Sequence, residues 1–296
     1  TVEWLYIPDP ATTMNALIAG EIDFWETPSP DLVPGMEGNP DITIKVIDPL
    51  GTQGWLRPNH LNPPFDNPKA RQALLHMVKQ EHYLQAIIGD EKFWRACGAY
   101  FMCDTPLDSD VGAGPLMNQD LEMARKLLKE GGYNGETLIL MDPTDIPVLH
   151  GASLVTAQML RKIGAKVEVQ AMDWSTLTSR RAETKSIADG GWNIFHTYST
   201  GADVASPIAN IGVSGGCVEE AWFGWPCDKM LEDLRDQFSR ESDPAKQVEI
   251  GIALQKRAYE VVPYVNYGQW FQPTAYRTSL KGVLISPVPF FWNIEK

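Results

Sequence analysis

The sequence is poor in positive charge and has no long apolar run. It contains 25 Lys and Arg against 38 Asp and Glu among 296 residues, so its net charge is −13. Nucleic acids and anionic membrane surfaces are bound through basic patches, so this balance argues against both partners. No segment approaches the ~18 consecutive apolar residues that span a bilayer. Hydrophobic residues still make up 44% of the chain, enough for the core of one or two domains.

Motifs for cofactors, metals and phosphate are also missing. The five His lack the spacing of zinc proteases, and there is no Gly-rich phosphate loop. We therefore expect no cofactor, although distant His residues could still assemble a metal site. Residues 212–216 read G-V-S-G-G and match the nucleophile elbow around Ser214. That motif needs a strand before it and a helix after it. The flanking residues favour a flexible turn instead, and a serine-type hydrolase using Ser214 stays the alternative.

Cysteine is scarce, and its four copies fall into two local pairs. Neither pair has the C-x-x-C spacing of redox or zinc motifs. An even number in local pairs predicts two short-loop disulfides, Cys97–Cys103 and Cys217–Cys227, and hence an oxidising compartment. The alternative is four free, buried thiols in a cytosolic protein.

Apolar periodicity predicts alternating strands and helices, which is the α/β class. The order strand, helix, strand over residues 137–172 indicates a parallel crossover unit. Long loops are expected at 91–115 and 200–226. Helices are expected at 11–19, from Pro68 after the Asn67 cap, and at 118–132, 147–163, 228–238 and 244–262. Strands are expected at 1–7, 21–25, 41–48, 137–141, 165–172, 192–198, 265–271 and 283–285.

Aromatic residues gather where strands are expected to end. They are Tyr198 at one strand end, Trp222 and Trp225 in the Gly-rich loop that follows, and Tyr267 and Trp270 on the last long strand. Aromatic faces bury ligand surface without charge, and Asp203 in the same loop could pair with an amine. The pattern predicts a small-molecule cleft. For any single Trp, a place in the core is an equal alternative.

Four stretches of the chain carry motifs in a recognisable order. They are ALIAGEID at 16–23, NHLNPPFDNPKARQAL at 59–74, ARKLLKEGGY at 124–133 and LRKIGAKVE at 160–168. In this order and spacing, the chain resembles the C-terminal part of the family 5 extracellular solute-binding proteins. These are the peptide, dipeptide, oligopeptide and nickel binding proteins of ABC importers.

The resemblance implies a periplasmic-binding-protein type II-like architecture of two lobes, with the second lobe complete and the first only partly present. Residues 1–57 would belong to the first lobe, 58–265 would form the second, and 266–296 would return to the first. Family members are longer, so an N-terminal stretch is expected outside this sequence. The implied function is capture of a peptide or similar small organic solute by hinge closure, and its delivery to a membrane permease, without catalysis. We expect a monomer in the periplasm, or one lipid-anchored outside the cytoplasm.

The resemblance also implies site residues. Asp203 stands near the position where peptide-binding members place an Asp that pairs with the α-amine of the ligand. Trp174 and Arg181 lie in a segment where members place aromatic and basic groups of the cleft. Tyr267 lies where members place a cleft tyrosine on the returning strand.

Trp222, Trp225 and the Cys217–Cys227 pair are not general features of the family. We expect this disulfide-closed loop to present an aromatic wall that sets ligand choice. The surroundings of Asp203 also differ from the family pattern, so a sugar, an opine or a nickel chelate stays an alternative ligand.

Overall fold

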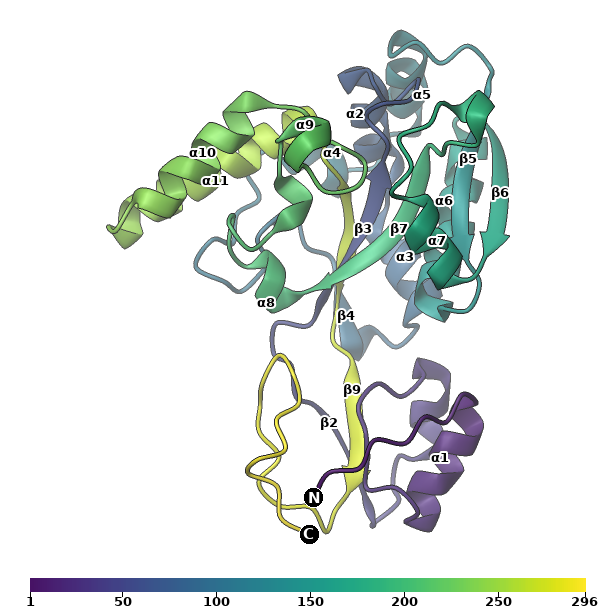
Figure 1. The fold of residues 1–296 in the computed structure, drawn as a ribbon, viewed down its shortest axis with the longest axis vertical. Helices are drawn as coiled ribbons and strands as arrows, with labels where there is room; N and C mark the ends of the chain where they lie inside the picture. The colour runs from purple at the N-terminus through teal and green to yellow at the C-terminus, as the bar shows by residue number, and fades with distance from the viewer.

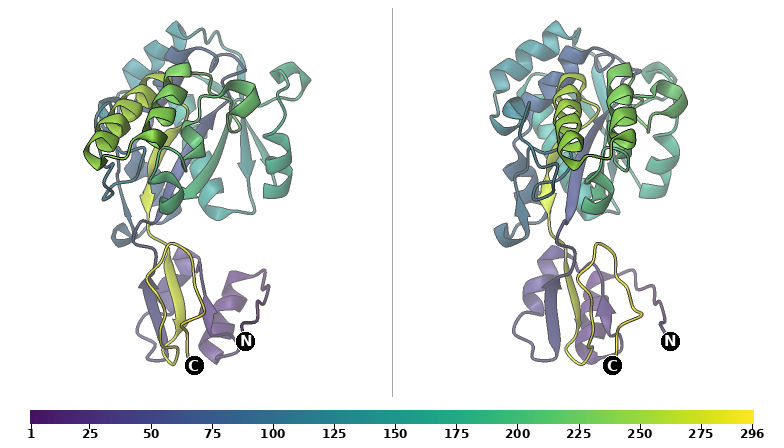
Figure 2. Two further views of the ribbon diagram at one scale, coloured as in Figure 1. Left: turned by 60° about the vertical axis from the view of Figure 1, so that its left-hand side comes forward. Right: turned by 90° about the vertical axis from the view of Figure 1, so that its left-hand side faces the viewer.

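Two β-sheets divide the chain into a larger and a smaller unit (Figures 1 and 2). The computed structural model describes residues 1–296. The larger sheet has six strands in the order β4-β8-β3-β7-β5-β6, and the smaller sheet has three in the order β1-β9-β2. Both chain ends lie in the smaller unit (Figure 1). The predicted α/β class is confirmed.

The six-stranded sheet is mixed. β3 (Thr52–Pro58) runs antiparallel to β7 (Ile194–Thr200) and to β8 (Val265–Trp270), and β8 pairs in turn with β4 (Trp94–Arg95). β5 (Thr137–Pro143) runs parallel to β6 (Lys166–Met172) on one side and to β7 on the other. The predicted crossover unit is confirmed, because α6 (Pro147–Lys162) joins the parallel strands β5 and β6.

Several helices begin directly after a capping side chain. Asn67 caps α2 (Pro68–Met77), Asp173 caps α7 (Trp174–Arg180) and Asp243 caps α11 (Pro244–Val261), each accepting a hydrogen bond from a backbone N–H. Such a cap satisfies a donor that has no partner within the helix. The other α-helices are α1 (Pro10–Ala19), α3 (Gln80–Ile87), α4 (Gly114–Met117), α5 (Leu121–Glu130), α8 (Gly201–Val204), α9 (Cys217–Glu220) and α10 (Lys229–Arg240). No helix combines the length and the apolar composition of a membrane span.

Both faces of the larger sheet are buried. On β5, Leu138 and Leu140 join the main hydrophobic core, while Ile139 and Met141 join a second, smaller cluster. Successive side chains of a strand point to opposite faces, so the two clusters lie on opposite sides of the sheet. The second cluster also contains Leu177 of α7, Trp192, Phe195 and Trp225. The helix α7 and the segment around Trp225 therefore cover the face opposite the main core.

The smaller unit contains α1, β1 (Phe24–Trp25), β2 (Ile42–Val46) and β9 (Pro273–Arg277). The chain enters the larger unit between β2 and β3 and returns between β8 and β9, so two segments join the units (Figure 2). β3 and β8 pair with each other inside the larger sheet. The chain therefore passes between the units at residues 46–52 and 270–273, whereas the expected boundaries followed residues 57 and 265.

Expectations at the chain ends are wrong. Residues 1–7 form no strand, because their backbone has no pairing partner. Trp4 packs edge-on against Phe291 instead, with 5.5 Å between ring centroids. Residues 283–285 form no strand either, and the last strand is β9, which pairs with β1 and β2. The two predicted loops contain short elements: β4 lies within 91–115 and α4 begins at the end of that range, while α8 and α9 lie within 200–226.

Candidate functional site

The parallel strands of the larger sheet end at one edge. β5, β6 and β7 run in the same direction, so the residues that follow them lie together. Figure 1 shows this edge turned toward the smaller unit. In open α/β sheets, ligands bind outside the carboxyl ends of the strands. The residues placed here are Asp173 and Trp174 after β6, and Asp203 after β7.

Arg181 lies among aromatic rings on the sheet face that α7 covers. Its guanidinium carbon Cζ is 5.3 Å from the ring centroid of Trp174, 5.8 Å from Phe195, 5.0 Å from Trp222 and 4.7 Å from Phe223. These distances are within the ~6 Å over which a cation is attracted to an aromatic face. We call Arg181 with these four rings the Arg181 cage.

Arg181 has no acceptor within the protein. Its Nε is buried and has no hydrogen-bond partner. Burial lowers the pKa of Arg181 below its usual value, and no nearby acid opposes that effect. A buried donor without an acceptor costs about 1–3 kcal/mol. An unpaired guanidinium is suited to a carboxylate, which this planar group binds through paired hydrogen bonds.

The preceding residue, Arg180, is paired by contrast. Its Nη1 donates to Gln170 Oε1 at 2.5 Å, and its Nε and Nη2 donate to the Gly190 carbonyl at 3.3 and 3.2 Å. Arg180 is therefore hydrogen-bonded within the fold, whereas the adjacent Arg181 has no hydrogen-bond partner for its Nε–H.

Asp203 and Tyr198 are accessible at the same edge. Asp203 is exposed in α8, and its Oδ2 accepts a hydrogen bond from the Thr200 hydroxyl at 2.8 Å, which leaves Oδ1 without a partner. Tyr198, on β7, is 44% exposed and packs edge-on against Trp270, with 5.8 Å between centroids. Partial burial raises the pKa of the Tyr198 hydroxyl.

Three predicted ligand contacts lie in the core instead. Tyr267 is fully buried, and its hydroxyl donates to the Thr197 carbonyl at 3.2 Å. Trp270 is 2% exposed and stacks on Tyr267, while Trp225 is 5% exposed and packs on Trp192 at 5.8 Å. All six residues of β8 are buried, because the strand has a neighbour on each side and a helix against it. In this structure these three side chains are packed inside the protein and present no surface to a ligand.

Phe195 and Phe223 complete the cage, and neither was expected there from the sequence. The available signals were their positions: Phe223 adjoins Trp222, and Phe195 lies on a predicted strand. Neither signal shows which face of the sheet receives Arg181.

Both predicted disulfides are present. Cys97 pairs with Cys103, and Cys217 pairs with Cys227, with Cα–Cα distances of 5.9 and 4.1 Å. The second disulfide closes the loop that carries Trp222 and Phe223. Trp222 and Phe223 of this loop lie against Arg181, whereas Trp225 turns into the core.

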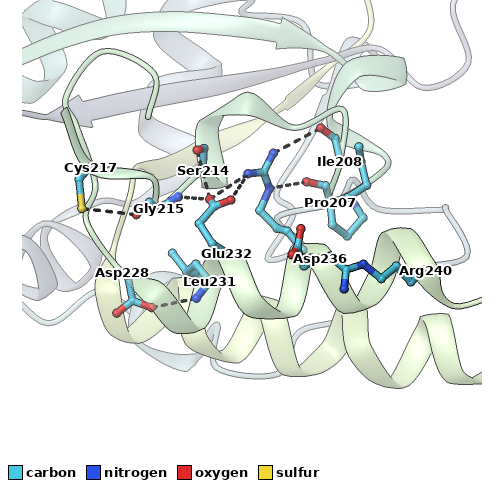
Figure 3. A network of polar contacts seen from close by, with 11 residues as sticks. Pro207, Ile208, Ser214, Gly215, Cys217, Asp228, Leu231, Glu232, Asp236 and Arg240 are labelled. Carbon is cyan, nitrogen blue, oxygen red and sulfur yellow. Dashed lines mark hydrogen bonds and ion pairs between the residues drawn. The ribbon is translucent and has the colours of Figure 1, made fainter. Parts of the chain in front are cut away.

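Ser214 belongs to a structural network (Figure 3). Its hydroxyl donates to Glu232 Oε1 at 3.2 Å, and the Gly215 N–H donates to the same oxygen at 2.5 Å. Arg235 Nη1 lies 2.8 Å from both oxygens of that carboxylate. A serine nucleophile needs a base within hydrogen-bond reach, and the group in reach of Ser214 is a carboxylate already bound by an arginine. The network ties this turn to α10. No group of three His, Cys, Asp or Glu side chains is arranged to hold a metal ion.

Two units joined by two segments, with the carboxyl ends of the parallel strands facing the smaller unit, are the architecture of a two-lobed binding protein. Residues 1–217 match the family model described as bacterial extracellular solute-binding proteins, family 5 middle. The chain belongs to this family, as the motif order predicted. Its members are extracellular or periplasmic binding proteins.

Curated relatives of this chain are also described as binding proteins. The chain is 35% identical over 291 residues to the "Probable peptide ABC transporter periplasmic-binding protein y4tO" of Sinorhizobium fredii, covering 98% of this chain and 55% of that protein. It is 25% identical to the oligopeptide-binding protein AppA of Bacillus subtilis, covering 100% of this chain and 55% of that protein. The chain thus spans about half the length of these curated relatives.

Solved structures share the fold. The PBP AgaA from A. tumefaciens R10, in complex with agropinic acid, matches with a TM-score of 0.80 at 20% identity over 95% of this chain and 56% of its own. The periplasmic binding protein DppA from Helicobacter pylori, in complex with peptide STSA, matches with 0.79 at 22% identity over 97% and 55%. At these identities the likeness shows the fold alone. It confirms a partial two-lobed architecture.

Proposed function

We propose that this chain is part of the solute-binding component of an ABC importer. The component captures a peptide or a similar small organic solute between two lobes and delivers it to a membrane permease, without catalysis. Family membership and the relatives support a binding role. The two disulfides support a location in an oxidising compartment such as the periplasm.

The single observation that carries the ligand class is Arg181. It is a half-buried cation, enclosed by four aromatic rings, whose buried Nε–H has no acceptor. A solute with a carboxylate would pair with the Arg181 guanidinium, which has no acidic partner within the protein. The free Oδ1 of Asp203, which follows the end of β7, favours an amine elsewhere in the same solute. A peptide carries both groups.

The experiment uses the full-length protein, which includes the part of the relatives' length that lies outside this chain. Native mass spectra of freshly purified protein are recorded, and whatever denaturation releases is identified. Co-purified short peptides of mixed sequence are the expected result. One discrete non-peptide mass, such as an opine, a sugar or a nickel chelate, would keep the binding role and overturn the peptide.

The hydrolase alternative has its own test. Ester hydrolysis is measured for the wild type and for Ser214→Ala. We expect no activity from either protein, because Ser214 is held by Glu232. Activity in the wild type that is lost in Ser214→Ala would contradict the proposal.

A further inference from the structure

Arg57, on β3, is fully buried and has no acidic partner. All of its side-chain hydrogen bonds go to backbone carbonyls: Nε donates to Phe223 at 2.6 Å, Nη2 to Trp222 at 3.2 Å, and Nη1 to Gly212 at 2.6 Å and Pro263 at 3.0 Å. Burial lowers the pKa of Arg57 to about 9. A buried charge is costly, and here charge-assisted hydrogen bonds to carbonyls offset that cost.

Two of these carbonyls belong to residues of the Arg181 cage. The ring of Trp222 also contacts two guanidinium groups, with Arg57 Cζ at 5.3 Å and Arg181 Cζ at 5.0 Å from its centroid. Arg57 thus contacts Trp222 through both its carbonyl and its ring, and Trp222 in turn contacts Arg181.

The turn of the loop at Gly224 packs closely against the Arg57 side chain. Gly224 has a φ of +99°, and a Cβ at this position would lie 2.9 Å from Arg57 Nε and 2.8 Å from the Pro58 carbonyl oxygen. The Trp225 N–H donates back to the Trp222 carbonyl at 3.0 Å, which closes the turn. The Cys217–Cys227 disulfide joins the two ends of the loop, and Arg57 holds its tip.

We propose that Arg57 is a positioning residue of the solute site. It fixes the backbone at Trp222 and Phe223, so that their rings are already in place around Arg181 before a ligand carboxylate binds. Preorganised contacts raise affinity because their ordering cost is met during folding rather than during binding. This inference rests on the proposed function, since it takes Arg181 as the group that binds the carboxylate.

The test compares Arg57→Lys with Arg71→Lys in the full-length protein. Arg71 is a matched control: it is also buried, and it donates to the carbonyls of Phe65 at 2.7 Å, Asp66 at 3.1 Å and Val261 at 2.8 Å, away from the cage. Both variants keep the charge and lose the planar fork. Gly224→Ala is the second variant, because its Cβ pushes the loop off Arg57 while keeping the arginine.

One readout needs no ligand. The Nε–H of Arg181 is buried among aromatic rings, so its nitrogen–proton resonance should be protected from exchange and shifted by the rings. Assignment comes from its loss in Arg181→Lys. We expect Arg57→Lys and Gly224→Ala to move this resonance and Arg71→Lys to leave it in place. An unmoved resonance in both Arg57→Lys and Gly224→Ala, or an equal shift in Arg71→Lys, would overturn the inference.

The second readout is the affinity for Ala-Ala-Ala divided by that for its C-terminal amide. A purely structural role lowers stability and leaves this ratio unchanged. We expect Arg57→Lys to reduce the ratio by about tenfold, the size of one weakened charged contact, and Arg71→Lys to preserve it. If the wild type binds neither probe, the peptide proposal fails for this probe, and the resonance still decides the role of Arg57.

Discussion

The guanidinium of Arg181 lies closest to Phe223, with 4.7 Å between its Cζ and the ring centroid. Aromatic faces attract a cation, yet they are poor substitutes for a hydrogen-bond acceptor. The cage can therefore hold Arg181 in one place without using up its donors. An acid in the same place would have formed an internal ion pair and closed the site to anions.

Replacing Arg181 with Gln removes the charge at the centre of the cage. We expect the affinity for a carboxylate-bearing ligand to fall by about 1.5–3 kcal/mol, or roughly 10- to 150-fold in Kd, as for a hydrogen bond to a charged group. Calorimetric titration of the full-length protein measures the change. Stability should rise or stay level, since an unpaired, partly buried charge is lost.

Arg180→Gln is the matched control for that prediction. Its guanidinium is used by Gln170 and by the Gly190 carbonyl, so the variant should lose stability and keep ligand affinity. A loss of affinity equal to that of Arg181→Gln would assign the effect to general positive charge and contradict the cage as the site.

Asp203→Asn tests the other end of the ligand. The substitution keeps the size of the side chain and removes the charge that faces an amine. We expect a free-amine peptide to bind more weakly by about 1.5–3 kcal/mol, because a charge-assisted hydrogen bond is lost. The N-acetylated peptide is the control: it has no amine to pair, so its affinity should be the same for Asp203 and Asn. A similar loss for both peptides would remove Asp203 from the amine site.

The secondary structure was largely predictable because its signals are local. Asn67-Pro68 and Asp243-Pro244 each specify a helix start within two residues, and both helices begin where expected. β9 was missed because a strand of five residues depends on its partners β1 and β2, which are far away in sequence. Residues 1–7 show the converse, since an alternating pattern without a pairing partner forms no strand.

The candidate site was only partly predictable. Arg181 and Trp222 were expected as site residues from the family pattern and the aromatic loop, and the structure brings them together. Tyr267 and Trp270 were expected in the cleft and lie in the core, because strand position does not show whether a helix covers that face. Nothing in the sequence indicated a role for Arg57, because arginine is usually exposed. Only the tertiary structure shows its four carbonyl partners.

His196 should make the fold sensitive to acid. It is fully buried between Ser153 and Thr156, beside the ring of Tyr267, and burial lowers its pKa to about 3. Above its unfolded value of about 6.5, both states are neutral and the residue has no pH effect. As the pH falls below that value, the unfolded chain binds a proton that the folded chain refuses, so stability decreases down to about pH 3.

The corresponding variant is His196→Gln. Between about pH 7.5 and pH 5, the wild type should lose about 2 kcal/mol of unfolding free energy through this residue, and the variant should not. Urea unfolding at the two pH values gives the difference. The exposed His82 provides the control variant His82→Gln, which should keep the wild-type pH dependence. An unchanged slope in His196→Gln would mean that His196 is protonated in the folded state.

Asp228 has two roles at the start of α10, and they can be separated. It caps the helix by accepting the Leu231 N–H at 2.9 Å, and it accepts two hydrogen bonds from Arg257 of α11, at 3.1 Å from Nε and 2.5 Å from Nη2. Burial opposes ionisation of Asp228, but the hydrogen bonds from Arg257 and the helix N–H groups outweigh it and lower its pKa. The pair therefore joins two adjacent helices as well as ending one of them.

Asp228→Asn keeps the cap and loses the ion pair, whereas Asp228→Ala loses both. We expect Asn to cost about 1–2 kcal/mol of unfolding free energy, and Ala about 1 kcal/mol more, the usual value of a cap. Asp243 at the start of α11 is the matched control, since it caps through the Ala245 N–H at 2.9 Å and is exposed without an ion pair. Asp243→Asn should be neutral, and Asp243→Ala should cost about 1 kcal/mol. Equal costs for the two Asn variants would show that the Arg257 pair adds nothing beyond the cap. A larger cost at Asp228 would show that this pair fixes α10 against α11, and with α10 the Glu232 carboxylate that holds the turn at Ser214.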